Sequence, residues 1–173
     1  MHIHDLANIA GMGTGFTVMA AQGFRIKERL MRLSERLTNN RFWRGLIVPG
    51  GVSRDFDEAM LQDIQETVGG VMEEMTQLIE MSLNTDSLRE RLENTGILQK
   101  AAAIAYGALG VGARGSGVDR DVRRDHPYAA YGDFPVHLIT QRNGDVFARF
   151  KMREKEMNVS EQLIMHFVGE CLK

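Results

Sequence analysis

Eight side chains that carry charge or titrate near neutral pH lie within thirteen consecutive residues in the second half of the chain. They are Arg114, Asp119, Arg120, Asp121, Arg123, Arg124, Asp125 and His126. The arginines and aspartates nearly cancel in charge, so solubility does not require them. At this density opposite charges must form ion pairs, and partly buried pairs are costly unless their partners satisfy them well.

Two interpretations of this charged segment are open. In the first, the ion pairs form a structural cluster that holds a loop against the rest of the fold. In the second, they form a proton- or anion-handling site, because arginines hold neighbouring acids ionised or shift their pKa values. His126 then adds a group that titrates near neutral pH, and Tyr128 or Tyr131 can donate a hydrogen bond to a carbonyl-type ligand.

Other stretches offer less chemistry. The run Pro49-Gly50-Gly51 predicts a sharp turn, with a loop that lines a site as the alternative. The glycines between Gly11 and Gly15 lack dinucleotide-binding spacing and follow no strand, so they indicate close helix packing or a local break. The histidines are scattered and Cys171 is the only cysteine, so the sequence predicts no metal site and no activated nucleophile.

The composition is typical of one soluble globular domain, with 173 residues, 43% of them hydrophobic and 25% charged. A net charge of −2 argues against nucleic-acid binding, which normally needs a basic face. A single cysteine cannot form a disulfide within the chain, which favours a reducing compartment. The uncharged stretch from Leu6 to Phe24 is too polar and too rich in glycine for a membrane-spanning helix.

Apolar residues at helical spacing predict the helices that must position the charged segment. The first helix begins at or before Met1, and the others cover about Gln22–Thr38, Arg54–Leu83, Leu88–Glu93, Gln99–Tyr106 and Glu154–Leu172. Ser53 is the expected N-cap of the longest helix, and Gly69-Gly70 in its middle predicts a kink or a close helix crossing. Neither end of the chain carries a capping or stop signal, so we expect a single domain over residues 1–173 that is an internal fragment of a larger subunit.

The dipeptide Asn143-Gly144 predicts a β-hairpin, because it favours the tight turn that joins two antiparallel strands. The strands would be Val136–Thr140 and Val146–Phe150. The predicted fold class is therefore mainly α, a helical bundle with one small antiparallel β-hairpin near residues 135–151.

The order and spacing of several motifs resemble a known family. From Ser116 to Ser160 the chain reads SGVDRDVRRDHPYAAYGDFPVHLITQRNGDVFARFKMREKEMNVS. This resembles the pattern R-A-S-G-V-x-x-D-x-R-x-x-x-P-Y-x-x-Y, then N-G-D-x-x-x-R and E-M-x-x-S, of the large subunit of respiratory NADH:quinone oxidoreductase (complex I). It is more similar still to the relatives in group 4 nickel-iron hydrogenases and formate hydrogenlyase. Upstream, HIHDLANIA resembles their H-x-x-D-L-G helix, and the run from Ile47 to Val52 resembles their P-G-G-V or I-G-G-V loop.

This resemblance implies a mostly helical electron-transfer subunit of a membrane-associated complex, cytoplasmic and peripheral to the membrane. In the resembling complexes the large subunit docks a small iron–sulfur subunit, and their interface holds a quinone pocket or a nickel–iron centre. The two cysteine pairs that hold that metal are not in this sequence, so we expect no cofactor bound by this piece and no activity in isolation. Other subunits of the complex are expected partners, and apolar surface left uncovered predicts self-association of the piece.

The resemblance also assigns roles to residues. Those that would shape the catalytic surroundings are Arg114, Asp121, Arg123, Arg124, His126 and Tyr128, and Pro49, Gly50 and Gly51 would form a loop that lines the site. Gly115 replaces the usual alanine, and Gly13 stands where many relatives carry an aspartate, which weakens any proton relay that would use that acid. The alternative function is a non-enzymatic helical assembly module that docks an iron–sulfur subunit.

Overall fold

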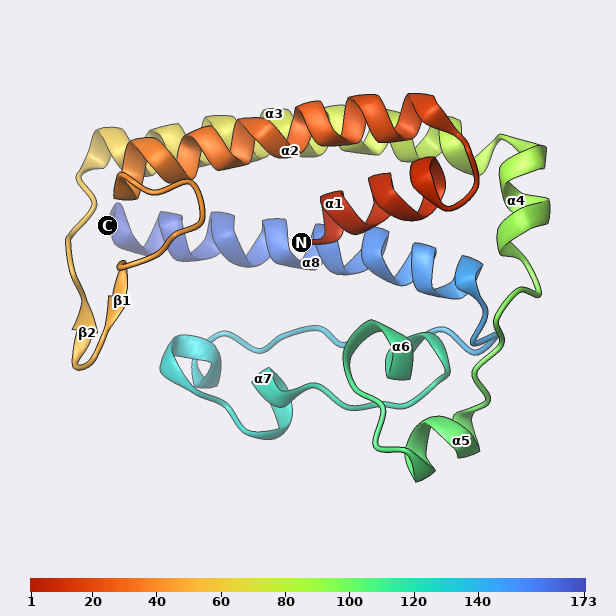
Figure 1. The fold of residues 1–173 in the computed structure, drawn as a ribbon. Coiled ribbons are helices and arrows are strands. Elements are labelled where there is room, and N and C mark those ends of the chain that lie inside the picture. Colours follow the sequence, from red (N-terminus) through yellow and green to blue (C-terminus); the bar gives the residue numbers. More distant parts are fainter.

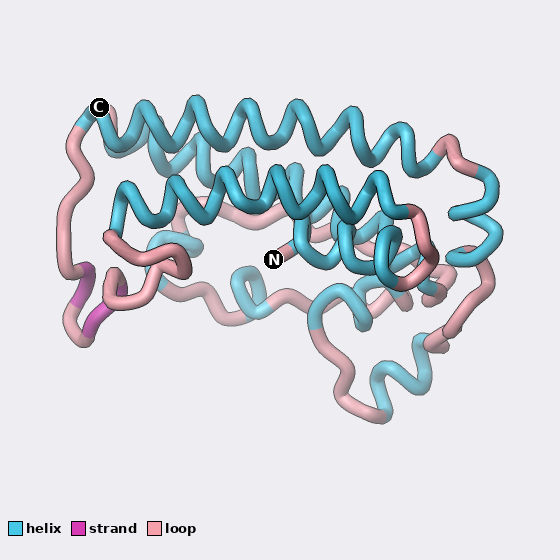
Figure 2. The backbone as a smooth tube through the Cα atoms, turned by 45° about the horizontal axis from the view of Figure 1, so that its top comes forward, coloured by secondary structure: helices cyan, strands magenta, loops and turns pink.

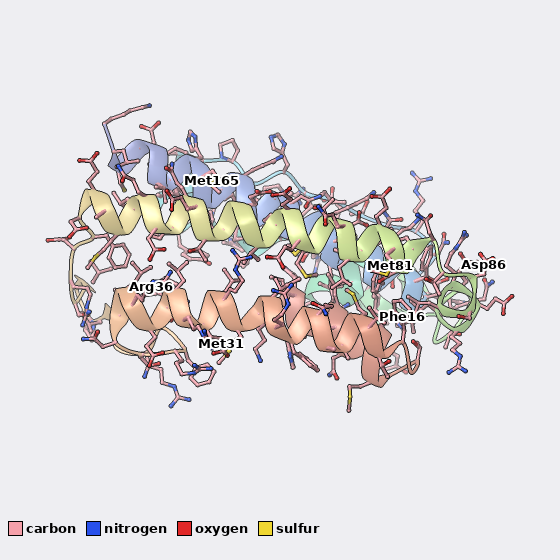
Figure 3. All side chains as sticks on the ribbon, turned by 90° about the horizontal axis from the view of Figure 1, so that it is seen from above. Phe16, Met31, Arg36, Met81, Asp86 and Met165 are labelled. Carbon is pink, nitrogen blue, oxygen red and sulfur yellow. The ribbon has the colours of Figure 1, made fainter.

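The computed structural model describes residues 1–173, and it is mainly helical, as predicted (Figure 1). Three long helices form the frame: α2 (Thr17–Thr38), α3 (Glu58–Leu83) and α8 (Val146–Cys171). The short α1 (His2–Ala7) continues into a π-helical turn, η1 (Asn8–Met12), and contacts both α2 and α8. Helices α2 and α3 run antiparallel alongside each other, with Arg36 at one end of the pair and Phe16 and Met81 at the other (Figure 3).

A single large apolar cluster of 21 buried residues joins α1, α2, α3 and α8 with the short α4 (Asp86–Leu92). In α2 the buried side chains Met19, Ile26, Leu33 and Leu37 follow helical spacing, so one face of the helix turns to the core. Burial of such side chains contributes roughly 25 cal/mol for each Å² of apolar surface removed from water. The apolar cluster therefore fixes the frame of the fold.

Glycines let the helices approach each other closely. A Cβ atom at Gly11 would lie 2.2 Å from the Cβ of Ala20, and one at Gly23 would lie 2.6 Å from the Cβ of Ala7. A Cβ at Gly70 would lie 2.9 Å from Nη2 of Arg29 on α2. The prediction of close helix packing at the first glycine run is therefore confirmed, whereas Gly70 leaves space for the end of the Arg29 side chain and a close helix crossing at Gly69-Gly70 stays a prediction.

The starts of α2 and α3 differ from the prediction by a few residues, and α8 begins at Val146 rather than at Glu154. The N-cap of α3 is Asp57, whose carboxylate accepts a hydrogen bond from the Met60 amide at 2.8 Å. Ser53 does not cap this helix, because its hydroxyl donates to the Gly45 carbonyl oxygen at 2.6 Å. The C-cap of α2, Asn39, has a φ of 56°, the left-handed conformation that asparagine tolerates.

The prediction of a hairpin near residues 135–151 is wrong in its position. The structure has one small hairpin, in which β1 (Ile47–Val48) pairs with β2 (Gly51–Val52), with Ile47 opposite Val52. Its turn runs through Pro49 and Gly50, and Gly50 and Gly51 have φ values of 92° and 148° that a residue with a side chain rarely adopts.

The residues after Asn143-Gly144 form a helix because Asp145 caps it. The Asp145 carboxylate accepts a hydrogen bond from the Ala148 amide at 2.7 Å, which satisfies one of the free N–H groups at the start of α8. Phe147 and Phe150 then lie three residues apart, and both are buried in the apolar cluster. Gly144 still has a positive φ of 67°, but it leads into a helix rather than a second strand.

Residues 94–145 form a separate layer on the side of α8 that faces away from α2 and α3 (Figure 1). Its short elements are α5 (Lys100–Ala105), α6 (Gly110–Gly115), α7 (Val122–Asp125) and the 3-10 turn η2 (Ala129–Gly132). Most of this layer is loop, in contrast to the continuous helices above it (Figure 2). None of the helices has both the length and the apolar character needed to cross a membrane.

Candidate functional site

Arg114 and Glu156 form a buried ion pair that joins the 94–145 layer to α8. Nε and Nη2 of Arg114 lie 2.7 Å and 2.6 Å from Oε1 of Glu156. Both residues are only 8% exposed. Arg114 comes from the last turn of α6, and Glu156 from the middle of α8. The pair therefore fixes where the charged segment lies on the bundle.

Asp121 extends this pair into a cluster of four charges. Its carboxylate binds Arg123 through two contacts, 3.0 Å to Nε and 2.7 Å to Nη2, and lies 3.4 Å from Nη1 of Arg114. It also accepts a hydrogen bond from the Arg123 amide and so caps α7. Arg114, Asp121, Arg123 and Glu156, here named the charge quartet, carry two positive and two negative charges, so the burial of three of them leaves no net charge uncompensated.

Within the charge quartet, the contact between Asp121 and Arg123 favours the charged form of both side chains. The Arg123 guanidinium holds the pKa of the Asp121 carboxyl below its usual range, although burial acts in the opposite direction. Asp121 in turn raises the pKa of Arg123 above its usual value. The sequence-based expectation of ion pairs that are partly buried is therefore confirmed.

His2 lies on the other side of Glu156 from Arg114. Its Nε2 is 3.5 Å from Oε2 of Glu156. Burial lowers the pKa of His2 below its ordinary value, and the Glu156 carboxylate opposes this shift. Neither residue was predicted to belong to the site, although both fall in the motifs that carry the resemblance, His2 in H-x-x-D-L and Glu156 in E-M-x-x-S.

A cleft of about 880 Å³ opens beside the charge quartet. The charged or titratable side chains that line it are His2, Arg114, Arg120, Asp121, Arg123, Asp125, His126, Tyr128 and Glu156. Apolar lining comes from Met1, Leu109, Val111 and Val122. Five of the six residues predicted to shape the catalytic surroundings thus line one cleft, and the arrangement can hold an anionic or carbonyl-type group close to three guanidinium groups.

The remaining predicted residues lie elsewhere. Arg124 does not line the cleft; it is exposed and pairs with Asp119 at 2.7 Å and with Asp125 at 2.9 Å. Arg124 lowers the pKa of the Asp125 carboxyl through a side-chain hydrogen bond. Pro49, Gly50 and Gly51 form the turn of the hairpin and are not among the residues that line the cleft. A lining role for this loop stays a prediction.

The donor atoms of this chain do not fit a nickel–iron centre or an iron–sulfur cluster. Such groups are held by several thiolates, and the only cysteine, Cys171, is exposed at the end of α8. No group of three or more histidine, cysteine, aspartate or glutamate side chains is placed to hold a metal ion.

Comparison with known proteins places the sequence of this chain in a family. Residues 13–172 match the family model described as "Respiratory-chain NADH dehydrogenase, 49 Kd subunit". The chain is 30% identical to the NADH-ubiquinone oxidoreductase 49 kDa subunit of Cafeteria roenbergensis, over 94% of this chain and 40% of the relative. It is 34% identical to hydrogenase-4 component G of Escherichia coli (strain K12), over 90% of this chain and 25% of the relative. The chain thus spans less than half the length of these relatives, and it belongs to the family of the 49 Kd subunit of the respiratory-chain NADH dehydrogenase.

Proposed function

We propose that this chain is part of the large subunit of an oxidoreductase, either of the NADH–quinone oxidoreductase type or of the related nickel–iron hydrogenase type. In this proposal the cleft beside the charge quartet is one wall of the redox site. The names of the relatives support an oxidoreductase subunit, one as part of an NADH-ubiquinone oxidoreductase and the other as part of a hydrogenase. The whole protein would act in a complex at the membrane, and a small iron–sulfur subunit would dock against the cleft.

One observation carries the proposal. The segment with the family motif places Arg114, Asp121 and Arg123 on the wall of a cleft, with their charges balanced by Glu156 from α8. Ion pairs that only stabilise a fold do not need to border a space large enough for a small molecule. Since pocket-lining arginines bind negative oxygen atoms strongly, this wall suits a reaction in which an oxygen atom of the substrate gains negative charge.

The chain's own residues have limited tasks in this proposal. The guanidinium groups of Arg114 and Arg123 orient a ligand and stabilise negative charge on it. His126 and Tyr128 lie at the same cleft and can exchange or donate protons there. A quinone in the cleft, or a nickel–iron centre held by cysteines outside this sequence, would supply the redox chemistry. The electrons would come from iron–sulfur clusters of the partner subunit.

The substitution Arg123→Ala in the intact complex tests the proposal. We expect assembly to be normal and turnover to fall by about tenfold or more, since one charge-assisted contact to the reacting group is lost. The matched control is Arg36→Ala, because Arg36 makes an equivalent contact with Asp63 at 2.8 Å and 2.7 Å but lies between α2 and α3. Turnover should not change in this control.

Two outcomes would contradict the proposal in different ways. Unchanged turnover in the assembled Arg123→Ala complex would remove the cleft from the redox site. Failure of that variant to assemble would instead favour the alternative function, a helical module that docks an iron–sulfur subunit without taking part in the reaction. That alternative is supported by the full pairing of the quartet charges, which needs no ligand to be satisfied.

A further inference from the structure

Glu156 is shared between two partners that differ in kind. Its Oε1 atom binds the permanently charged Arg114, and its Oε2 atom faces Nε2 of His2, which can be neutral or charged. All three residues line the cleft. The charge that Glu156 presents to His2 therefore depends on how strongly Arg114 neutralises it.

We propose that His2 and Glu156 form a proton-accepting pair, which takes up a proton when negative charge arrives at Arg114 in the cleft. This inference rests on the proposed function, because the arriving charge is that of a small acceptor whose oxygen atom becomes negative on reduction by the partner subunit. The step itself is proton transfer alone. One proton leaves a hydronium ion in the cleft and binds to Nε2 of His2 or to Oε2 of Glu156.

In the resting state, the His2–Glu156 pair is not expected to bind an extra proton. The charge quartet is balanced without His2, and burial favours the neutral ring. When a negative oxygen atom shares the Arg114 guanidinium, less of its charge is left to compensate Glu156. The carboxylate is then a stronger base beside a neutral imidazole, and the two groups titrate together as one coupled pair.

Two of the other charged groups around His2 compensate each other. On α8, Arg153 lies near His2, and its Nε binds Asp5 of α1 at 3.2 Å. The amino group of Met1 adds a positive charge that disfavours protonation of the ring. Of the two acids near His2, only Glu156 has its negative charge compensated by a residue that lines the cleft, Arg114.

The ring of His2 is held on one side only. Its Nδ1 atom is buried and has no hydrogen-bond partner, so no second contact fixes its protonation state. His4 provides an internal reference on the same helix. Its Nδ1 is also buried without a partner, but its ring packs against Phe24 and faces no carboxylate.

The first test is a pH titration of the full chain by NMR, in which the imidazole signals of His2 and His4 and the side-chain carboxyl carbon of Glu156 are followed. The variant Arg114→Gln removes the compensating charge and mimics the arrival of a negative one. We expect the apparent pKa of the His2–Glu156 pair to rise by about one unit or more, and that of His4 to stay constant. The variant Arg114→Lys, which keeps the positive charge, should leave the pair close to its wild-type value.

Three results would overturn the inference: no change at His2 or Glu156 in Arg114→Gln, an equal change at His4, or the same rise in Arg114→Lys. If Arg114→Gln fails to fold, Glu156→Gln serves as the second variant. It removes the acid that favours the charged ring, so the pKa of His2 should fall further while that of His4 is unchanged. An unchanged pKa of His2 in folded Glu156→Gln would also contradict the proposal.

The second test is the pH profile of turnover in the intact complex with His2→Gln. Glutamine offers Glu156 an N–H donor, as the protonated ring does, but it cannot bind the proton, so we expect normal assembly and a shifted or flattened profile. A profile that coincides with the wild type would contradict a role of the pair in turnover. This failure is distinct from that of the proposed function, because Arg123→Ala would still lower turnover in a complex whose cleft is the redox site.

Discussion

The bundle and the 94–145 layer are stabilised in different ways. The bundle encloses an apolar cluster of 21 buried residues, whereas the apolar cluster of the layer consists of only Ala103, Ala113 and Val118. The layer is attached to α8 through polar contacts, among them the buried Arg114–Glu156 pair, and through the contacts of the Phe134 ring with His166 and Phe167. Apolar burial is non-directional and tolerates small shifts, but a buried polar contact fails when one partner is lost. The part of the molecule with the cleft is therefore the part whose geometry depends on individual side chains.

The largest expected effect belongs to the bundle. Phe150→Ala removes a fully buried ring and should lower the free energy of unfolding by about 3–5 kcal/mol. Phe42→Ala is the control, because that ring is 61% exposed, and its effect should stay within about 0.5 kcal/mol. Urea denaturation measures both values. Similar losses in the two variants would mean that the apolar cluster does not dominate the stability of the bundle.

A smaller effect is expected where the layer meets the bundle. An alanine Cβ at Gly144 would lie 2.2 Å from the Leu98 carbonyl oxygen, at a φ of 67°, so Gly144→Ala should cost about 1–3 kcal/mol. At Gly112, inside α6, no heavy atom lies within 4 Å of the new Cβ. Gly112→Ala should therefore stabilise the protein by about 0.5–1 kcal/mol. Thermal unfolding distinguishes these opposite signs, and a destabilised Gly112→Ala would contradict the open space at this position of α6.

The N-cap residues Asp145 and Asp57 allow the layer and the bundle to be compared once more, because Asp145 also contacts the layer and Asp57 does not. Each carboxylate caps a long helix, but Asp145 is buried and also accepts a hydrogen bond from the Asn94 amide at 2.9 Å. Asp145→Ala should cost about 1–2 kcal/mol, and Asp57→Ala about 0.5–1 kcal/mol. Hydrogen exchange provides the second readout, since only Asp145→Ala should speed exchange at the Asn94 amide. Equal costs with no change at Asn94 would show that this link to the layer is unimportant.

The smallest effect concerns acid stability. The pKa of Asp121 is lower in the folded protein than its ordinary value near 3.9, so the folded state gains stability above that pH and loses it as the pH falls through the folded pKa. Asp121→Asn lacks this titration. The difference in unfolding free energy between wild type and variant should therefore narrow as the pH is lowered below about 4, as followed by denaturation at several pH values. A constant difference would mean that Arg123 does not hold the acid ionised.

The same comparison explains what the sequence could predict. The bundle helices follow from apolar spacing along α2 and α3, and only their first residues were misplaced. The hairpin was misplaced because Asn143-Gly144 is compatible with two structures. The residue that decides between them is Asp145, whose side chain can cap a helix when Val146, Phe147 and Phe150 supply its apolar face. The real hairpin, with strands of two residues, is too short for an alternating pattern.

The site was predicted in part for a similar reason. The density of charge between Arg114 and His126 indicated ion pairs, and Asp121 and Arg123 lie close enough in the sequence to be paired by inspection. Glu156 lies 42 residues from Arg114 in the sequence. Nothing in the local sequence distinguishes Glu156 from the other polar residues of α8. His2 is still farther away along the chain. Contacts of this range depend on how the helices pack, which no local pattern contains.

The two ends of the 94–145 layer are hydrogen-bonded to each other. The Leu98 amide donates to the Gly144 carbonyl oxygen at 2.9 Å, and the Val146 amide donates to that of Thr95 at 2.9 Å. The chain thus leaves the bundle and returns to it at one point, so the layer is a long loop whose two ends are held together. Because the entropic cost of closing a loop grows slowly with its length, residues can be added or removed between these contacts while the bundle keeps its geometry. This junction gives the fold a modular design, in which a constant scaffold can carry cleft walls of different size and chemistry.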